Sequence, residues 1–274
     1  MSGRTFAKYE GLGNDFLVLD ATEWPEPELT PALAQRLCDR HRGVGGDGLL
    51  WVDRAGGAVR MVILNADGSR PEMCGNGVRC VAAWLVDRGD LAVGARIVVQ
   101  SDAGPRPVTV HSVRDGVAEV EVAMGRAVVT AEADAVSVGG AQVAVRAVDM
   151  GNPHGVVFAP TDDTMGLVRA VTGLAAFPKG VNVELVAPEE GGFRVRVHER
   201  GVGWTQACGT GACAVAAAAV AEGRWRAGEA VTVRLDGGPL VITVAAGSWD
   251  VTMRGPARRA FAGTVDAPPH PRHQ

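Results

Sequence analysis

Hydrophobic and polar residues alternate over many short stretches of this chain, a pattern typical of β-strands that bury one face. The stretches predict strands at residues 16–20, 59–64, 97–100, 117–122, 181–186, 193–198, 231–235 and 240–244. A further strand-like segment, 49–52, follows a glycine-rich stretch at 43–48. We therefore expect a chain dominated by short strands.

Three longer stretches, at residues 31–42, 76–87 and 210–222, have the spacing of apolar residues that is typical of helices. Thr30 is a suitable N-cap for the first of them, and Pro31 would occupy its first helical position. The third stretch is apolar on nearly every side, which predicts a helix buried inside its domain. Together the elements predict an α+β fold in which mainly antiparallel strands wrap around a central helix in each half.

A short series of motifs occurs twice in the same order, which indicates two related halves. Each half contains a Gly-Asn pair, then an asparagine, then a Cys-Gly-x-Gly motif: 13–14, 65 and 74–77, then 151–152, 182 and 208–211. Coincidence in a chain with 37 glycines is the alternative. We expect two pseudo-symmetric domains, residues 1–117 plus 258–266 and residues 118–257, and a disordered tail at 267–274.

Charge and cysteine content narrow the possible partners. The formal net charge of −4 argues against a nucleic-acid surface and favours a small-molecule partner. The longest apolar run, 212–221, is too short to span a bilayer, and the N-terminal segment lacks the pattern of a signal or transit peptide. Five cysteines, an odd number, fit free thiols in a reducing compartment. We expect a cytoplasmic protein that contacts no membrane.

The Cys-Gly-x-Gly motifs place Cys74 and Cys208 where helices are expected to begin. Free N–H groups and the positive end of the helix dipole lower the pKa of a thiol there and create a carboxylate site beside it. A single cysteine in this position is more often a buried packing residue. A matched pair, however, suits α-proton chemistry: one thiolate removes a proton and the other thiol returns one to the opposite face. The pair therefore predicts inversion of a stereocentre.

Cofactor and metal interpretations fit the residues less well. Pyridoxal phosphate needs a prepared Schiff-base lysine, and the chain offers only Lys8, on an expected strand, and Lys179, in a turn-like segment. The glycines at 43–48 match a dinucleotide fingerprint but follow a helix, so we interpret them as a helix-to-strand connection. Four thiols lack the C-x2-C spacing that suits structural zinc: Cys74, Cys80, Cys208 and Cys213. We expect neither a cofactor nor a metal.

Polar residues of the second half add candidates. His154 is placed to orient a thiol or to relay a proton, although a lone histidine is as often a packing or capping residue. Glu199 and Arg200 end an expected strand. They form either a solvated pair at the sheet edge or a site for the ammonium and carboxylate of a second amino-acid head.

Taken together, these motifs resemble those of the diaminopimelate epimerase family. The resemblance rests on GLGNDF at 11–16, NADGS at 65–69, MCGNGVR at 73–79, MGNPH at 150–154, GVNVE at 180–184 and HERGVGWTQACGTGA at 198–212. It implies two pseudo-symmetric domains with the active site in the cleft between them, often in a homodimer. It also implies a cofactor-independent isomerase that interconverts LL- and meso-2,6-diaminopimelate in lysine and peptidoglycan precursor synthesis.

The resemblance further implies roles for individual residues. The family's paired thiols fall on Cys74 and Cys208, and its assisting polar groups fall on His154 and Glu199. Its carboxylate-binding amides correspond to Gly75, Asn76, Gly209 and Thr210. The residues that hold the distal amino-acid head correspond to Asn65, Asn182 and Arg200, and the site is completed by Asn14, Asn152 and Glu199.

Three positions depart from the family's pattern. Trp204 stands where the family commonly has Glu, Gly48 where some members have Gln, and Tyr9 where His is frequent. None of these changes removes a thiol or an implied binding residue. Two alternatives stay open: a related two-thiol racemase acting on another amino acid, and a thiol-redox protein without this catalysis.

Overall fold

The computed structural model describes residues 3–158 and 162–266. Two compact units divide the chain, one comprising Met1–Val120 with Ala257–Gln274 and the other Glu121–Pro256. The domain limits given above stay a prediction, and the tail expected at 267–274 lies outside the described residues. Within the described part of the chain, no helix is long and apolar enough to cross a membrane.

The first unit is built from short strands and two helices. In chain order these are β1 (Arg4–Gly11), β2 (Asn14–Asp20), α1 (Pro31–Cys38), β3 (Gly48–Asp53), β4 (Val59–Asn65), α2 (Gly75–Asp87), β5 (Arg96–Ser101) and β6 (Gly104–Arg114). Short 3₁₀ turns occupy Glu26–Glu28 and Ala55–Gly57. Two strands, β7 (Val117–Arg126) and β17 (Asp250–Val265), have residues in both units.

The second unit has the same kinds of element. It contains β8 (Val128–Val129), β9 (Asp134–Val138), β10 (Ala141–Asp149), β11 (Pro153–Phe158), α3 (Thr164–Thr172), β12 (Asn182–Glu189), β13 (Gly192–Glu199), β14 (Gly203–Thr205), α4 (Gly209–Ala221), β15 (Ala230–Leu235) and β16 (Gly238–Val244).

One strand topology occurs in both units. In the first, β1–β2 is an antiparallel pair, β2–β3 is parallel across α1, β3–β4 is antiparallel, β4–β5 is parallel across α2, and β5–β6 is antiparallel. The second repeats this order with β10–β11, β11–β12, β12–β13, β13–β15 and β15–β16. Parallel pairing occurs where a helix makes the crossover, as the geometry of such connections requires. The sheets are therefore mainly antiparallel, as expected.

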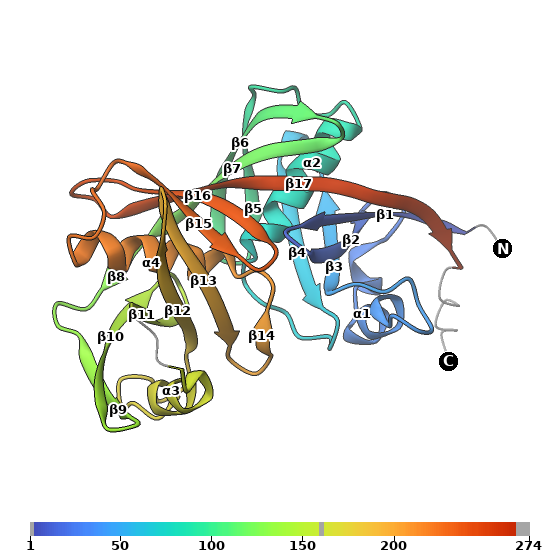
Figure 1. Cartoon of the computed structure of the whole chain (residues 1–274). Helices are drawn as coiled ribbons and strands as arrows, with labels where there is room; N and C mark the ends of the chain where they lie inside the picture. Colours follow the sequence, from blue (N-terminus) through green and yellow to red (C-terminus); the bar gives the residue numbers. More distant parts are fainter. Residues whose placement is uncertain (1–2, 159–161, 267–274) are drawn as a thin grey trace. The chain divides into compact units, whose positions relative to one another are not determined.

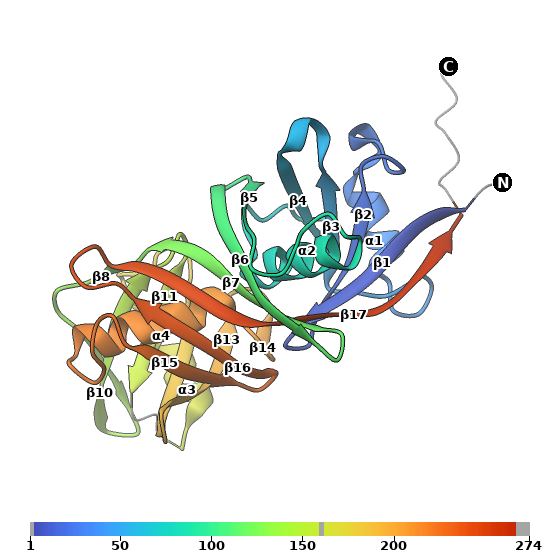
Figure 2. The same cartoon turned by 90° about the horizontal axis from the view of Figure 1, so that it is seen from above.

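Each unit wraps its strands around one helix. In Figure 1, α2 lies among the strands of the first unit, where it contacts β1, β2, β3, β4 and β6. In Figure 2, α4 lies among the strands of the second unit, where it contacts β10, β11, β12, β15 and β16. Nearly all of α4 is buried because alanine and valine cover every side of it. The α+β fold with a central helix in each half is thus confirmed.

The outer helices close two further cores. Leu33 and Leu37 of α1 pack with Leu49 and Trp51 of β3 in the first unit. In the second unit, the apolar face of α3 packs against strands β9 to β12 through Leu167, Val168 and Val171. The two crossover helices thus fix the parallel pairs whose ends carry the candidate site residues.

Helix limits differ from the sequence expectation mainly at α1, which ends at Cys38 instead of residue 42. The Asp39 carboxylate accepts the N–H groups of His41 and Arg42, and the Leu37 carbonyl accepts N–H groups from Val44 and Gly45. These bonds replace the helical ones and turn the chain. The glycines at 43–48 therefore connect a helix to strand β3, as expected, instead of forming a dinucleotide loop.

The sequence pattern missed α3 completely. Asp163 caps this helix by accepting the Gly166 N–H at 2.8 Å, and Gly173 follows its last residue. Glycine at position 166 weakened the helical pattern. A Cβ there would lie 2.0 Å from the Asp163 carboxylate, so the cap itself explains the glycine.

One correspondence within the proposed repeat is wrong. Asn65 ends β4, whereas Asn182 begins β12, whose counterpart in the first unit is β3. By topology and register, Asn65 corresponds to Glu199 at the end of β13, and Asn182 corresponds to Gly48. A common order along the chain did not fix which strand end each asparagine occupies.

Candidate active site

Cys74 caps helix α2 in the first unit. Its backbone is extended, with φ −142° and ψ 113°, and its sulfur accepts the Gly77 N–H at 3.5 Å. The side chain is only partly buried. A Cβ on Gly77 would lie 2.9 Å from Leu50 Cδ2, so close packing against β3 favours glycine at this point of the helix. The first turn of α2 therefore offers a thiol beside backbone donors.

Asn14 connects this cysteine to a charged cluster. The amide Oδ1 of Asn14 accepts from Asn76 Nδ2 at 3.1 Å and lies 3.9 Å from Cys74 Sγ. Its Nδ2 donates to Asp47 Oδ2 at 2.8 Å, so the amide oxygen is turned toward the helix. Asn14 follows a two-residue hairpin loop in which Leu12 and Gly13 both have positive φ, as in a type I′ turn.

The cluster behind Asn14 is held by opposite charges. Lys8 lies 2.8 Å from Asp15, and Arg40 contacts both Asp15 and Asp47. The guanidinium of Arg40 and the ammonium of Lys8 together overcome the effect of burial and hold the pKa of Asp15 at about 2. Lys8 is thus engaged in a structural ion pair, a poor setting for a Schiff base.

Cys208 caps helix α4 in the second unit with nearly the same geometry. Its φ is −123° and its ψ 107°, and its sulfur accepts the Gly211 N–H at 3.4 Å. The Thr210 hydroxyl lies 3.5 Å from the same sulfur. Only 6% of this cysteine is exposed. Burial, reinforced by the carboxylates of Glu199 and Glu184, raises the pKa of the Cys208 thiol, while the bonds from Thr210 and Gly211 oppose that rise.

A chain of hydrogen bonds leads from Cys208 into the core. Asn152 Nδ2 donates to Thr210 Oγ1 at 3.3 Å, and Asn152 Oδ1 accepts from His154 Nε2 at 3.0 Å. His154 Nδ1 lies 2.7 Å from Glu184 Oε1, and both side chains are fully buried. Burial raises the pKa of Glu184, and the interaction with His154 opposes that shift. The sequence-predicted His154 therefore sits in a buried network that includes Cys208.

Residues expected at the distal head occupy three strand ends. Asn182 Oδ1 accepts the backbone N–H of Arg200 at 2.9 Å, while the Arg200 guanidinium donates to the Lys179 carbonyl at 2.9 Å. Glu199 accepts a 2.6 Å hydrogen bond from Thr205. In the first unit, Asn65 Nδ2 donates to Ser69 Oγ at 2.9 Å. Asn182 and Arg200 are therefore brought together, and each strand end presents polar groups.

The three residues that depart from the family pattern lie in well-defined surroundings. Trp204 packs edge-on against His198, with ring centroids 5.2 Å apart, and Arg196 lies over its ring. Tyr9 is buried and donates to Asp87 at 2.6 Å, and burial together with this bond raises its pKa. A Cβ on Gly48 would lie 2.5 Å from the Leu64 carbonyl oxygen, so a larger residue there requires a backbone shift.

Sequence reasoning did not single out Asp47 or Glu184. Glu184 lies two residues after Asn182, and alternate residues of a strand face the same side. A carboxylate at that spacing, within the otherwise apolar run of β12, was the available signal. Asp47 offered no comparable pattern because its role depends on the chain reversal after α1.

No group of three or more His, Cys, Asp or Glu side chains comes together as metal ligands within the described residues. The thiols of Cys38, Cys80 and Cys213 are buried. Burial is the main factor that raises the pKa of Cys38 to about 12 and raises that of Cys80 further. These thiols have the properties of packing residues.

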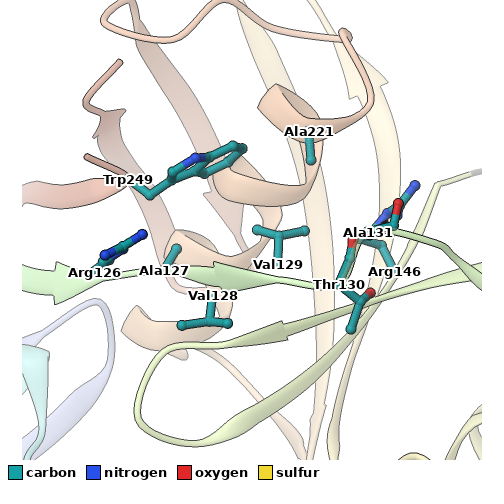
Figure 3. Close-up of a pocket in the computed structure, with 9 residues that line it drawn as sticks. All are labelled: Arg126, Ala127, Val128, Val129, Thr130, Ala131, Arg146, Ala221 and Trp249. Carbon is teal, nitrogen blue, oxygen red and sulfur yellow. Dashed lines mark hydrogen bonds between the residues drawn. The ribbon is translucent and has the colours of Figure 1, made fainter. Parts of the chain in front are cut away.

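A pocket of about 370 Å³ lies elsewhere in the second unit (Figure 3). Figure 3 shows Arg126 and Trp249 at one side and Thr130, Ala131 and Arg146 at the other, with Ala221 at the top of the view. Ala221 is the last residue of α4, whereas Cys208 caps its first turn. At 1.5 Å per residue these helix ends are about 20 Å apart, so this pocket is separate from the thiol.

Known sequences identify the family to which this chain is similar. Residues 6–130 and 146–260 match the family model described as diaminopimelate epimerase. A diaminopimelate epimerase of Synechococcus elongatus is 40% identical, covering 95% of this chain and 98% of that protein. One from Mycobacterium tuberculosis is 43% identical, covering 92% of this chain and 93% of that protein.

Solved structures share the fold at low sequence identity. A phenazine biosynthesis protein of the PhzF family from Bacillus anthracis aligns with a TM-score of 0.73 at 17% identity, covering 97% of this chain and 100% of that one. A probable proline racemase from Agrobacterium radiobacter aligns with a TM-score of 0.72 at 17% identity, covering 97% and 94%. These similarities concern the fold alone.

Proposed function

The chain belongs to the diaminopimelate epimerase family, and we propose that its two cap cysteines carry out that family's reaction. The reaction interconverts LL- and meso-2,6-diaminopimelate without a cofactor and supplies lysine and peptidoglycan precursor synthesis. The observation that carries the proposal is the repeated cap: Cys74 and Cys208 each accept an N–H from the first turn of a central helix.

The chemistry assigns complementary tasks to the two thiols. One cysteine, as thiolate, removes the α-proton, and the other, as thiol, delivers a proton to the opposite face, so configuration inverts. The negative charge that develops next to the α-carboxylate needs preorganised donors. The first-turn N–H groups of Gly75, Asn76, Gly209 and Thr210 are the donors we propose.

The remaining polar residues select the substrate. We assign the distal amino-acid head to Asn65, Asn182 and Arg200, because a guanidinium and two amides suit a carboxylate beside an ammonium. Asn14 and Asn152 orient the groups around the two thiols, supported by their bonds to Asn76 and Thr210. Glu199 and His154 assist proton transfer as polar neighbours.

Assembly and location belong to the same proposal. We propose a homodimer in the cytoplasm, where all five cysteines would stay reduced, without a disulfide. Sedimentation of the reduced protein at several concentrations tests the dimer, and a monomer at every concentration would contradict it.

Proton NMR in deuterium oxide tests the reaction. Reduced protein and LL-diaminopimelate, without cofactor, should give meso product with deuterium at one α-carbon. Cys74→Ala and Cys208→Ala should each abolish the conversion while remaining folded. Absence of exchange with the intact, reduced protein would refute the assignment.

A further inference from the structure

At equivalent strand positions next to the central helices α2 and α4, the two units carry different side chains. Phe16 lies opposite the first residue of β3, and His154 lies opposite the first residue of β12. Two residues further along those strands stand Leu50 and Glu184. The glycine three residues after each cap cysteine confirms this match, because its Cβ would meet Leu50 in one unit and Glu184 Oε1 in the other. The apolar pair Phe16–Leu50 therefore corresponds to the pair His154–Glu184.

Packing alone does not require the polar pair. Both side chains are 0% exposed, and a buried charged pair generally stabilises a fold no better than apolar groups of similar volume. The second carboxylate oxygen, Oε2, has no hydrogen-bond partner within residues 3–158 and 162–266. Since Phe16 and Leu50 fill the equivalent space in the first unit, filling that space does not by itself account for the polar pair in the second.

The His154–Glu184 pair sets the orientation of the Asn152 side-chain amide. In the first unit Asp47 binds the Asn14 nitrogen, which leaves the amide oxygen facing Asn76 and Cys74. In the second unit His154 binds the Asn152 oxygen, which leaves the amide nitrogen facing Thr210. The two equivalent asparagines therefore present opposite ends to their helices.

We propose that Glu184 is a positioning residue that, through His154 and Asn152, directs the Thr210 hydroxyl hydrogen to the sulfur of Cys208. The inference rests on the proposed function, in which Cys208 is an acid–base group. Glu184 holds His154 so that Nε2 carries a hydrogen and donates to Asn152. Thr210 Oγ1 then accepts from Asn152, so its own hydrogen is free for the sulfur.

The Thr210 hydroxyl matters as a donor because the other surroundings of Cys208 disfavour its thiolate form. Cys208 is buried, with carboxylates facing it from Glu199 on β13 and Glu184 on β12. On β11, His154 Nδ1 lies 2.7 Å from Glu184 Oε1, so this carboxylate is already engaged by a partner other than the sulfur. Two donors, the Gly211 N–H and the Thr210 hydroxyl, are then left to stabilise the charged sulfur.

The pH dependence of Cys208 alkylation tests the chain of bonds. Iodoacetamide is added to the Cys74→Ala protein across a pH series, and the modified Cys208 peptide is quantified by mass spectrometry. Thr210→Val should raise the pH midpoint by about one unit, a tenfold loss of thiolate at a given pH. Thr210→Ser, the matched control, should keep the original midpoint. Equal midpoints for the Val and Ser variants would overturn the proposal.

The role of Glu184 is tested by replacing it with leucine, the residue at the equivalent position 50 of the first unit. Glu184→Leu should raise the midpoint when Thr210 is present and should not raise it further in the Thr210→Val protein, because both changes remove one interaction. A lower or unchanged midpoint with Thr210 present would show that Glu184 acts only as a nearby charge or as packing, and would overturn the proposal.

Two controls separate this test from a loss of folding and from the proposed catalytic activity. The double variant His154→Phe with Glu184→Leu installs the side chains that the first unit already accommodates, so it should fold and show the same raised midpoint. If it folds with the original midpoint, the proposal fails. Alkylation needs no turnover, so a failure of the epimerase assignment in the NMR experiment would leave these readings interpretable.

Discussion

At the scale of residues, similar motifs acquire different properties from their surroundings. Cys74 and Cys208 share a cap geometry, yet Cys74 is partly exposed and faces an amide oxygen, whereas Cys208 is buried among Glu184, Glu199 and Thr210. Burial and the two carboxylates raise the pKa of the Cys208 thiol. The same capping motif therefore places the two sulfurs in different surroundings.

Arg200 provides the test of substrate choice at this scale. Arg200→Ala should raise KM for diaminopimelate at least about tenfold, because a charge-assisted hydrogen bond contributes roughly 1.5–3 kcal/mol. The effect on kcat should be smaller, since Arg200 is assigned to binding and not to proton transfer. Steady-state kinetics in both directions measure the split.

A matched variant separates charge from packing. Arg200→Lys keeps a cation but loses the planar fork, and should give a KM between those of the parent and the alanine variant. Unchanged kinetics for Arg200→Ala would remove Arg200 from the binding site and would favour a different amino-acid substrate.

At the scale of elements, the sequence patterns predicted the two helices that carry the thiols and missed α3, which packs against strands of the second unit. The runs at 76–87 and 210–222 gave α2 and α4 to within one residue at each end, because glycine, cysteine and apolar residues mark their limits. The pattern missed α3 because the helix has only nine residues, contains Gly166 and is followed at once by Gly173. Its stability comes from a side-chain cap and from burial against neighbouring strands.

The cap of α3 yields a prediction about stability. Asp163→Ala should lower the free energy of unfolding by about 1 kcal/mol, because the Gly166 N–H loses its side-chain partner. Asp163→Asn, which retains a capping oxygen, should lower it by much less. Urea denaturation followed by circular dichroism measures both, and equal losses in the two variants would contradict a capping role.

At the scale of the whole molecule, the first unit buries weakly acidic groups that keep their protons. Burial raises the pKa of Cys38 from 9.0 to about 12, and also raises the pKa values of Cys80 and of the Tyr9 hydroxyl. In the unfolded chain these groups ionise at their ordinary pKa, while the folded protein still holds their protons. Their contribution to stability is complete below pH 9.0 and is lost as pH rises through the folded values.

Alkaline denaturation should therefore be steep. Above pH 9.0, each buried thiol should lower the free energy of unfolding by about 1.4 kcal/mol per pH unit, in addition to any other titration. Cys38→Ala should flatten this dependence by about one such increment, even if it lowers the absolute stability. Urea titrations over this pH range measure the slope, and an unchanged slope in the variant would refute the linkage.

The sequence by itself determined the fold class, the two thiol-capped helices and the family, because these depend on local periodicity, on glycine and cysteine spacing, and on motif order. It placed Asn182 near Arg200 only through the family resemblance, and it paired Asn65 with the wrong counterpart. Tertiary structure alone decided which strand end each asparagine occupies, that His154 binds Glu184, and that Asn14 and Asn152 are turned in opposite senses. The physical reason is that strand register and side-chain hydrogen bonds join residues far apart in the chain, and no local pattern specifies such partners.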